Sequence, residues 1–503
     1  MADVVLAIDQ GTTGTTVFVV DGRGRIRGRA YAEIRQFYPR PGWVEHDPEE
    51  IYRSVIALAK KAIARSKVGA GAIKGIGITN QRETFVVWDR RTGKAMHRAI
   101  VWQCRRSAEI CEALREREPE VVARTGLILD PYFSGTKLKW LLDQQPELRR
   151  RGARGELCFG TIDSWLIYKL SRGAGFVTDF TNASRTMMFN LARREWDDEM
   201  LAMLEVPREM LPAAVGSRGP LASSAPGTIT AKEIPIAAVI GDQQSALFGQ
   251  GAVAAGDSKA TYGTGAFLLM NTGDKMVRSK NRLLTTAALG PEGEPAYALE
   301  GSVFIAGAAV QWLRDGLKLI RRAADSEREA RASKDRTQPY VVPAFVGLGT
   351  PHWDSGAKGA ILGITRGTTR ADIVRATLDS IAYQVRDVIV AMESDTGHPM
   401  SELRADGGAT ENRYLMQFQA DILGKPVRRA KIPETTAMGA AMLAGLATGL
   451  WKSHTQLADL NRGAALFEPK MQSAERERLL AGWHDAVARV LTTRPRASEG
   501  ANA

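Results

Sequence analysis

Residues 4–21 read VVLAIDQGTTGTTVFVVD, and this stretch constrains the fold more strongly than any other. Two apolar, largely β-branched runs, Val4–Ile8 and Val17–Val20, flank a turn of small polar residues, which predicts a hairpin of two buried strands. Gly11 and Gly14 let the backbone turn tightly and approach a ligand closely. The N–H groups and threonine hydroxyls of the turn are suitable donors to phosphate oxygens. Gly and Thr are also ordinary turn residues, so the stretch alone fits a turn that binds nothing.

A second strand–turn–strand pattern lies in the other half of the chain. Lys259–Asn271 reads KATYGTGAFLLMN, again with a Gly-Thr turn between two strands. It follows a buried strand, Ile234–Ile240, that ends on the polar residues GDQQ (241–244). The recurrence indicates a duplicated domain plan, and 503 residues suffice for two cores. We therefore predict two domains, 1–250 and 251–493, followed by a disordered tail at 494–503.

Caps and apolar periodicity place the main helices. A proline opens a helix that runs from Pro48 to about Ser66, and a capping box at 369–372 opens a long helix that Gly397 stops. The predicted helix Gly301–Lys318 would carry Gly307 and Gln311 on one face. Glu434–Gly449 is predicted to be an Ala/Gly-rich helix that can approach a neighbour closely. Pro207–Pro226 is rich in Pro, Gly and Ser and is predicted to be a loop.

Charge and cysteine content exclude several classes of function. The net charge is +12, from 68 basic and 56 acidic residues. The basic residues are dispersed, with local runs at Arg149–Arg154 and Arg321–Arg336, so we expect no nucleic-acid binding. The cysteines, Cys104, Cys111 and Cys158, have no metal-ligand or disulfide spacing. No signal-peptide layout or apolar run of ~20 residues is present, and we expect a cytoplasmic protein with no membrane span.

Three common catalytic or nucleotide-binding signatures are absent from the sequence. It contains no G-x-x-x-x-G-K-[ST] loop, no G-x-G-x-x-G between a strand and a helix, and no G-x-S-x-G elbow. Any phosphate grip must therefore come from the two hairpins.

Five short motifs occur in a fixed order along the chain: DQGTTGT (9–15), NQRE (80–83), IGDQQSALFGQG (240–251), TYGTGAF (261–267) and DGGATEN (406–412). Each is weak alone, but together they resemble the FGGY carbohydrate kinases of the actin–hexokinase superfamily, from about Val4 to at least Trp451. The resemblance implies an α/β fold of two ribonuclease-H-like domains, each with a βββαβα core. The active site would then lie in the cleft between the domains.

Within that family the chain is most similar to the members that phosphorylate glycerol. The resemblance therefore implies transfer of a phosphoryl group from ATP to glycerol, giving sn-glycerol 3-phosphate, with Mg²⁺ and as a homodimer or homotetramer. Asp242 would be the catalytic base. The residues implied to hold glycerol are Arg82, Glu83, Tyr132, Asp242, Gln243 and Phe267. Those implied to hold the nucleotide are Gln10, Gly11, Thr12, Thr13, Gly14, Thr264, Gly265, Gly307, Gln311, Gly408 and Asn412, and those implied to hold Mg²⁺, through water, are Asp9 and Asp242.

Each of these residues also has a purely structural interpretation. Arg82 and Glu83 could form a surface ion pair, and Asp242 could cap a helix. Tyr132 and Phe267 could be core aromatics, 307–311 could be helix packing, and 406–408 could be a simple turn. Two other functions also remain open: a kinase for another small polyol or ketose (xylulose, erythritol, dihydroxyacetone), and an ATP-binding scaffold that transfers nothing.

The chain departs from the family pattern at two places. Thr16 stands where bacterial members often carry Arg, which leaves one auxiliary phosphate contact in doubt. Enterobacterial members bind the inhibitor fructose 1,6-bisphosphate through a Gly-x-Arg loop, and here that region, 230–233, reads TAKE, with Glu233 at the arginine position. A carboxylate repels the bisphosphate. We expect no strong inhibition by fructose 1,6-bisphosphate in a steady-state assay, and micromolar inhibition would contradict this expectation.

Overall fold

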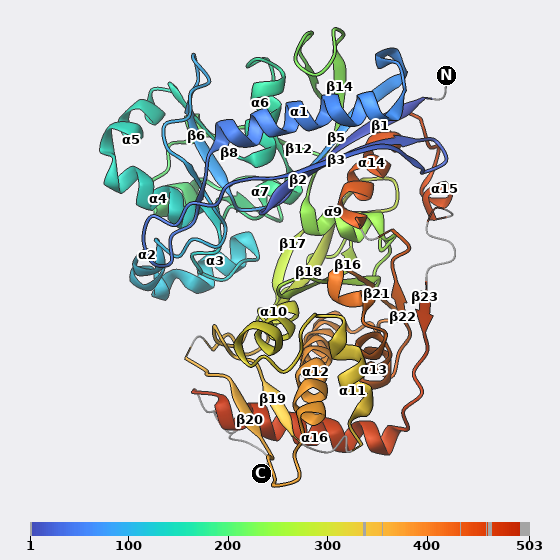
Figure 1. Ribbon diagram of the computed structural model, residues 1–503. Coiled ribbons are helices and arrows are strands. Elements are labelled where there is room, and N and C mark those ends of the chain that lie inside the picture. The colour runs from blue at the N-terminus through green and yellow to red at the C-terminus, as the bar shows by residue number, and fades with distance from the viewer. Residues whose placement is uncertain are drawn as a thin grey trace.

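The computed structural model describes residues 3–334, 339–354, 356–432, 434–458, 460 and 465–492. Two large mixed sheets, one in each half, lie one above the other with helices between and around them (Figure 1). The described helices include none that is both long enough and apolar enough to cross a membrane. The predicted tail falls outside the described residues.

The first sheet has six strands in the order β13-β14-β5-β1-β2-β3. The first three strands along the chain, β1, β2 and β3, are antiparallel, while β5 and β14 run parallel to β1. Their bounds are β1 Val4–Gln10, β2 Gly14–Asp21, β3 Ile26–Glu33, β5 Ile73–Asn80, β13 Arg218–Ser224 and β14 Ile234–Gly241. The predicted first hairpin is therefore confirmed.

Alternation of side chains along β1 puts apolar residues on both faces of this sheet. Leu6 and Ile8 pack against α1 (Pro48–Ser66) and α6 (Ile162–Leu170), whereas Val5 and Ala7 pack against α14 (Thr435–Ala447). The predicted close approach of this last helix is confirmed, because a Cβ on Gly77 would lie 2.2 Å from the backbone oxygen of Ala440.

The second sheet repeats the strand order of the first and carries one additional edge strand, β17, beside β18. Its order is β17-β18-β16-β15-β21-β22-β23, with β15, β16 and β18 antiparallel and β21 and β22 parallel to β15. The bounds are β15 Ser258–Tyr262, β16 Ala266–Gly273, β17 Leu284–Leu289, β18 Pro295–Val303, β21 Leu403–Asp406, β22 Val427–Arg429 and β23 Ala465–Phe467. This matching order confirms the second hairpin and the duplicated plan.

The second sheet is also covered on both faces. One face packs against α12 (Arg370–Thr396), α13 (Arg413–Leu423) and α16 (Ser473–Val490). The other face meets α9 (Asp242–Gly249), which lies against α14 at the junction of the two halves (Figure 1). The long helix α12 has the predicted capping box at Thr369 and ends at Gly397, which takes a left-handed conformation.

Smaller elements complete the upper half, around a four-stranded sheet in the order β4-β7-β6-β8. Its strands are β4 Glu45–His46, β6 Phe85–Asp89, β7 Ala99–Ile100 and β8 Leu157–Thr161. The helices packed around it include α2 Ala108–Ala113, α3 Glu118–Thr125, α4 Ser134–Gln144, α5 Pro146–Ala153, α7 Phe180–Ala183 and α8 Asp198–Leu204. The strand pairs β9 (Val177–Asp179) with β12 (Ala213–Val215) and β10 (Phe189–Asn190) with β11 (Glu195–Trp196) lie beside them.

The remaining elements flank the second sheet. They are α10 Gly307–Gln311, α11 Asp325–Ala332, and the paired strands β19 Tyr340–Val342 and β20 Ala360–Leu362. The short helix α15, His454–Ala458, lies instead beside α14 and the first sheet (Figure 1).

Two predicted segments are wrong in detail. Gly301, the expected start of a helix, lies in β18, and the helix begins only at Gly307. The expected loop 207–226 contains β12 and β13. β13 is an edge strand whose ladder is irregular between Arg218 and Ala222, where a Gly and a Pro stand, and edge strands tolerate both residues.

Candidate active site

The first hairpin turn is held from behind by buried amides. The Gly11 N–H donates to the Gly14 oxygen at 2.9 Å, which closes the turn. The Gln10 side chain is buried, donates to the Gly11 oxygen at 2.8 Å and accepts from Gln81 at 3.1 Å. Thr13 is exposed at the tip, and the Thr12 hydroxyl accepts from the Trp102 indole N–H at 2.8 Å. The turn therefore presents its backbone and its threonines outward, while Gln10 supports it from within.

The second hairpin turn is joined directly to the start of α10. The N–H groups of Ala306 and Ala308 donate to the Thr264 oxygen, and that of Gly307 donates to the Gly263 oxygen at 2.9 Å. A Cβ on Gly307 would lie only 2.5 Å from that same Gly263 oxygen. This close backbone approach is the physical reason for a glycine at position 307.

The other predicted nucleotide residues lie on neighbouring elements of the same half. Gln311 is exposed at the end of α10. Gly408 is exposed, and no atom lies within 4 Å of a Cβ built there. The Asn412 side chain caps α13 by accepting from the Leu415 N–H at 3.0 Å, and it donates to Ser326 at 3.2 Å. Asn412 thus has a structural task whether or not it contacts a ligand.

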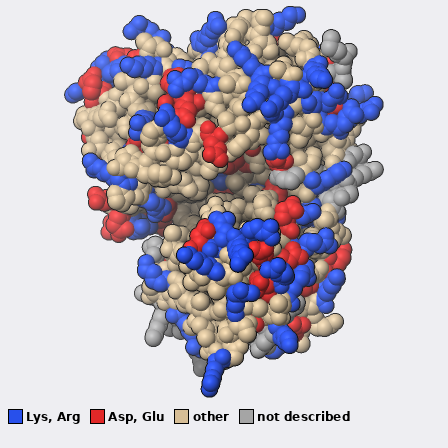
Figure 2. Space-filling model, in the orientation of Figure 1, with Lys and Arg blue, Asp and Glu red and all other residues tan. Residues whose placement is uncertain are grey.

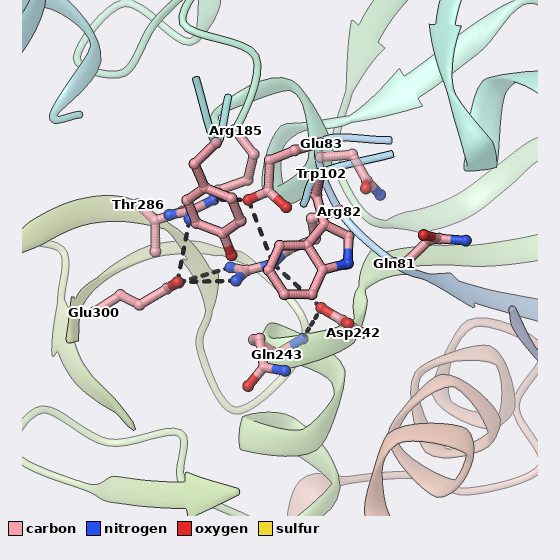
Figure 3. Close-up of polar contacts among 12 residues, drawn as sticks. Gln81, Arg82, Glu83, Trp102, Arg185, Asp242, Gln243, Thr286 and Glu300 are labelled. Carbon is pink, nitrogen blue, oxygen red and sulfur yellow. Dashed lines mark hydrogen bonds and ion pairs between the residues drawn. The ribbon is translucent and has the colours of Figure 1, made fainter. Parts of the chain in front are cut away.

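Arg82 and Glu83 are not a surface ion pair, because their side chains are only 2% exposed and belong to a buried ionic cluster (Figure 3). Glu300, on β18 of the second sheet, receives both terminal nitrogens of Arg82, at 2.6 and 2.9 Å. Arg185 bonds to Glu83 at 2.6 Å and to Glu300 at 3.1 Å. Two arginines and two glutamates therefore balance one another across the junction of the two halves.

Asp242 opens α9 at the end of β14, beside this cluster (Figure 3). Its carboxylate lies 3.2 Å from the Arg82 Nε, yet 26% of the side chain stays exposed. Asp242 follows the N-cap residue Gly241, and the same oxygen that contacts Arg82, Oδ1, accepts from the adjacent Gln243 N–H at 2.7 Å. Burial raises the pKa of Asp242, while Arg82 and Lys259 oppose that rise. A partly open carboxylate with a free oxygen is the arrangement that a proton acceptor needs.

Aromatic side chains from both halves form one wall next to Asp242. The Trp102 ring meets Tyr132 edge-on with centroids 5.5 Å apart, and it meets Phe267 of the second half at 6.3 Å. All three rings are partly exposed, so they are not core aromatics. Gln243 bonds through its side chain to the buried Lys259 at 2.5 Å. A compartment with an apolar wall and several polar groups suits a small polyol.

The donor set at Asp9 and Asp242 fits Mg²⁺. Burial and the nearby charge of Asp242 raise the pKa of Asp9 to about 7. Mg²⁺ typically binds one or two carboxylates, keeps several waters and takes its other ligands from phosphates. No cluster of three or more His, Cys, Asp or Glu side chains that could hold a metal occurs in the described part of the chain. The pair therefore suits a hydrated ion that arrives with a nucleotide.

Sequence reasoning missed four residues of this site: Glu300, Arg185, Trp102 and Lys259. None of the four lies within the five motifs. Glu300 follows the apolar run AYAL inside β18, and a lone charge within a buried strand was the signal that could have singled it out.

Comparison with known proteins identifies the family. Residues 4–249 match the N-terminal domain of the FGGY family of carbohydrate kinases, and residues 258–448 match its C-terminal domain. The chain belongs to the FGGY family of carbohydrate kinases. The predicted resemblance and the predicted actin/hexokinase-like, two-domain α/β fold are both confirmed.

Individual relatives match this FGGY kinase over nearly its whole length. It is 55% identical to glycerol kinase 2 of Thermotoga maritima over 97% of this chain and 98% of that one. It is 52% identical to the glycerol kinase of Bacillus licheniformis over 97% and 99% of the two chains. The crystal structure of Plasmodium falciparum glycerol kinase with ADP superimposes with a TM-score of 0.93 at 37% identity, covering 98% of this chain and 99% of that one.

Proposed function

We propose that the chain transfers the γ-phosphoryl group of ATP to glycerol, giving sn-glycerol 3-phosphate and ADP, with Asp242 as general base. The observation that carries this proposal is the partly exposed Asp242 carboxylate beside the buried Arg82–Glu83 pair and the aromatic wall. Relatives that are 50–55% identical to this chain over nearly their whole length bear the name glycerol kinase.

The acceptor is held by complementary polar groups. Arg82 and Gln243 donate to glycerol oxygens, and Glu83 and Asp242 accept from its hydroxyls. Tyr132 and Phe267, with Trp102 in contact with both, offer apolar faces to the carbon skeleton. The two arginine–glutamate pairs hold this set in place before substrate arrives, so little ordering remains to be done on binding.

The transfer step uses these groups in sequence. A terminal glycerol oxygen attacks the γ-phosphorus, the bond from that phosphorus to the β–γ bridging oxygen breaks, and ADP leaves with the bond's electrons. The hydroxyl proton passes to a carboxylate oxygen of Asp242. When bound, Mg²⁺ neutralises charge on the β- and γ-phosphates, and Asp9 and Asp242 are the residues that would hold it through water.

Turns from opposite halves would grip the phosphates. The proposed contacts come from 10–14 on the first sheet and from Thr264 and Gly265 on the second, with Gly307, Gln311, Gly408 and Asn412 nearer the nucleoside. On the face shown in Figure 2 the surface is hollowed between the upper and lower halves. Closure of such a cleft excludes water and limits wasteful hydrolysis of ATP. We place the boundary between the two domains at 250/251 and the reaction in the cytoplasm. We also propose that the enzyme is a homodimer or homotetramer, and sedimentation velocity tests this oligomeric state.

The deciding experiment is ADP release from Mg-ATP with glycerol, dihydroxyacetone, erythritol, xylulose or no acceptor. Strong release with glycerol alone, with sn-glycerol 3-phosphate recovered, is the expected result. Preference for another acceptor would keep the role of Asp242 and overturn the assignment of the wall. Release that ignores every acceptor would favour a nucleotide-binding scaffold instead.

Substitution of Gly307 by alanine is expected to raise the KM for ATP about tenfold and to leave the KM for glycerol within about twofold. A tenfold change corresponds to a loss of ~1.4 kcal/mol in binding free energy. The new Cβ would lie 2.5 Å from the Gly263 oxygen and push α10 away from the second turn. Steady-state kinetics at varied ATP measure the effect. Gly71→Ala is the control, because nothing lies within 4 Å of a Cβ there. An unchanged KM for ATP in Gly307→Ala would mean that this turn does not hold the nucleotide.

A further inference from the structure

Lys137 lies fully buried in the first turns of α4, and its side chain is aimed at the back of the acceptor wall. Its Nζ donates to the backbone oxygens of Tyr132 at 2.7 Å, Pro131 at 3.0 Å and Trp102 at 3.4 Å. An ammonium has three N–H donors, so the three carbonyls satisfy it completely. All three of these hydrogen bonds go to uncharged acceptors, which is a costly way to bury a cation.

Two of the three carbonyls that Lys137 holds belong to Trp102 and Tyr132, the residues that the first half contributes to the aromatic wall. Trp102 and Tyr132 come from separate loops, and Lys137 is the side chain that ties the two backbones together. Their rings then meet edge-on, and the Trp102 indole reaches Thr12 in the first hairpin turn at 2.8 Å. The same helix start also holds Glu83, because the Ser134 hydroxyl donates to the Glu83 oxygen at 2.9 Å.

We propose that Lys137 is a positioning residue that fixes Trp102 and Tyr132 for recognition of the acceptor. It touches no substrate itself. It acts by joining the two loops of the wall, and its protonated form, with three donors, is the competent one. This inference rests on the proposed function only for the identity of the acceptor.

The charge state of Lys137 supplies a test that a purely structural role would not pass. Burial lowers the pKa of Lys137 to about 8, against the pull of Glu83, Cys104 and Asp130, with Arg105 acting in the same direction as burial. Between that pKa and the unfolded value near ~10.4, the unfolded chain binds more protons, so the contribution of Lys137 to stability rises with pH. Its contribution to acceptor binding falls over the same window, because a third donor is lost. Activity and stability therefore move in opposite directions.

The experiment compares wild type, Lys137→Met and the control Lys139→Met from pH 7 to 9.5. Lys139 lies two residues along α4 and forms ion pairs with Asp143 and Glu205 away from the wall. Lys137→Met is expected to raise the KM for glycerol about tenfold at pH 7, with the KM for ATP within about twofold, and Lys139→Met to change neither. The ratio of kcat/KM for glycerol in wild type to that in Lys137→Met should fall below about threefold at pH 9.5. Taking the ratio to Lys137→Met cancels the titration of Lys259, whose pKa is also lowered to about 8.

If Lys137→Met does not fold, Lys137→Gln replaces it, because glutamine keeps two N–H donors without a charge. The KM for glycerol of Lys137→Gln is expected to lie between those of wild type and Lys137→Met. Equal increases in both KM values, or a kcat/KM ratio that stays constant with pH, would overturn the proposal. If the acceptor panel selects another polyol, the same comparison is made with that polyol. Calorimetric affinity for glycerol gives a readout that does not depend on turnover.

Discussion

Asp242→Asn is expected to lower kcat with glycerol by about 10²–10⁴-fold, the usual contribution of a positioned general base. Asparagine has nearly the same shape and can accept a hydrogen bond, but it cannot take the hydroxyl proton. The partly exposed carboxylate, 3.2 Å from Arg82, leaves one oxygen for that proton. The KM for ATP should stay within about threefold, because the hairpin turns hold the phosphates. Rapid-quench measurement of a single turnover tests the chemical step directly.

Two variants separate the loss of the base from other effects. Asp9→Asn should raise the Mg²⁺ concentration needed for half-maximal rate, whereas excess Mg²⁺ should not rescue Asp242→Asn. Asp315→Asn, which alters only an exposed pair with Arg314, should behave as wild type. If Asp242→Asn turns over near the wild-type rate with both substrates bound, another group takes the proton.

The parts of the fold that the sequence predicted are those in which local pattern and packing agree. In the hairpin at 4–21, successive apolar side chains point to opposite faces of a sheet that is buried on both sides. Capping residues at both ends fix the bounds of α1 and α12. The start of the helix at Gly301 was mispredicted because the apolar run VFIAGAAV, 303–310, continues from the last residue of β18 into α10 without a break in pattern. β13 was missed because an edge strand with Gly219 and Pro220 has the composition of a loop.

The site shows the same division between local and long-range information. Arg82 and Asp242 can be found from the sequence because each lies within a short motif that is continuous in the chain, NQRE (80–83) and IGDQQSALFGQG (240–251). Glu300 and Arg185 lie 218 and 102 residues away from their partners Arg82 and Glu83. Only the fold of the second sheet against the first brings them together. Lys137 was missed because its partners are backbone carbonyls, which leave no trace in the side-chain sequence.

The second large effect is expected for the buried cluster. Glu300→Met should lower the free energy of unfolding by about 3–5 kcal/mol, because it removes the buried carboxylate that both arginines share and leaves them only Glu83 and the partly exposed Asp242. Arg82→Met combined with Glu300→Met should recover most of that loss, since Arg185 and Glu83 then remain as one balanced pair at 2.6 Å. Denaturant unfolding of the two single variants and the double variant gives the coupling energy.

Activity is expected to separate from stability in this double-mutant cycle. The double variant should fold nearly as well as wild type and yet show a KM for glycerol raised at least about tenfold, because it lacks the Arg82 donor to the acceptor. Glu156→Gln, which removes exposed pairs with Arg151 and Arg154, should change neither unfolding nor kinetics measurably. A double variant no more stable than Glu300→Met would show that Glu300 stabilises the junction through contacts other than Arg82. The expected outcome would separate two roles of the cluster: charge balance, which holds the two halves together, and the proposed donation from Arg82 to the acceptor.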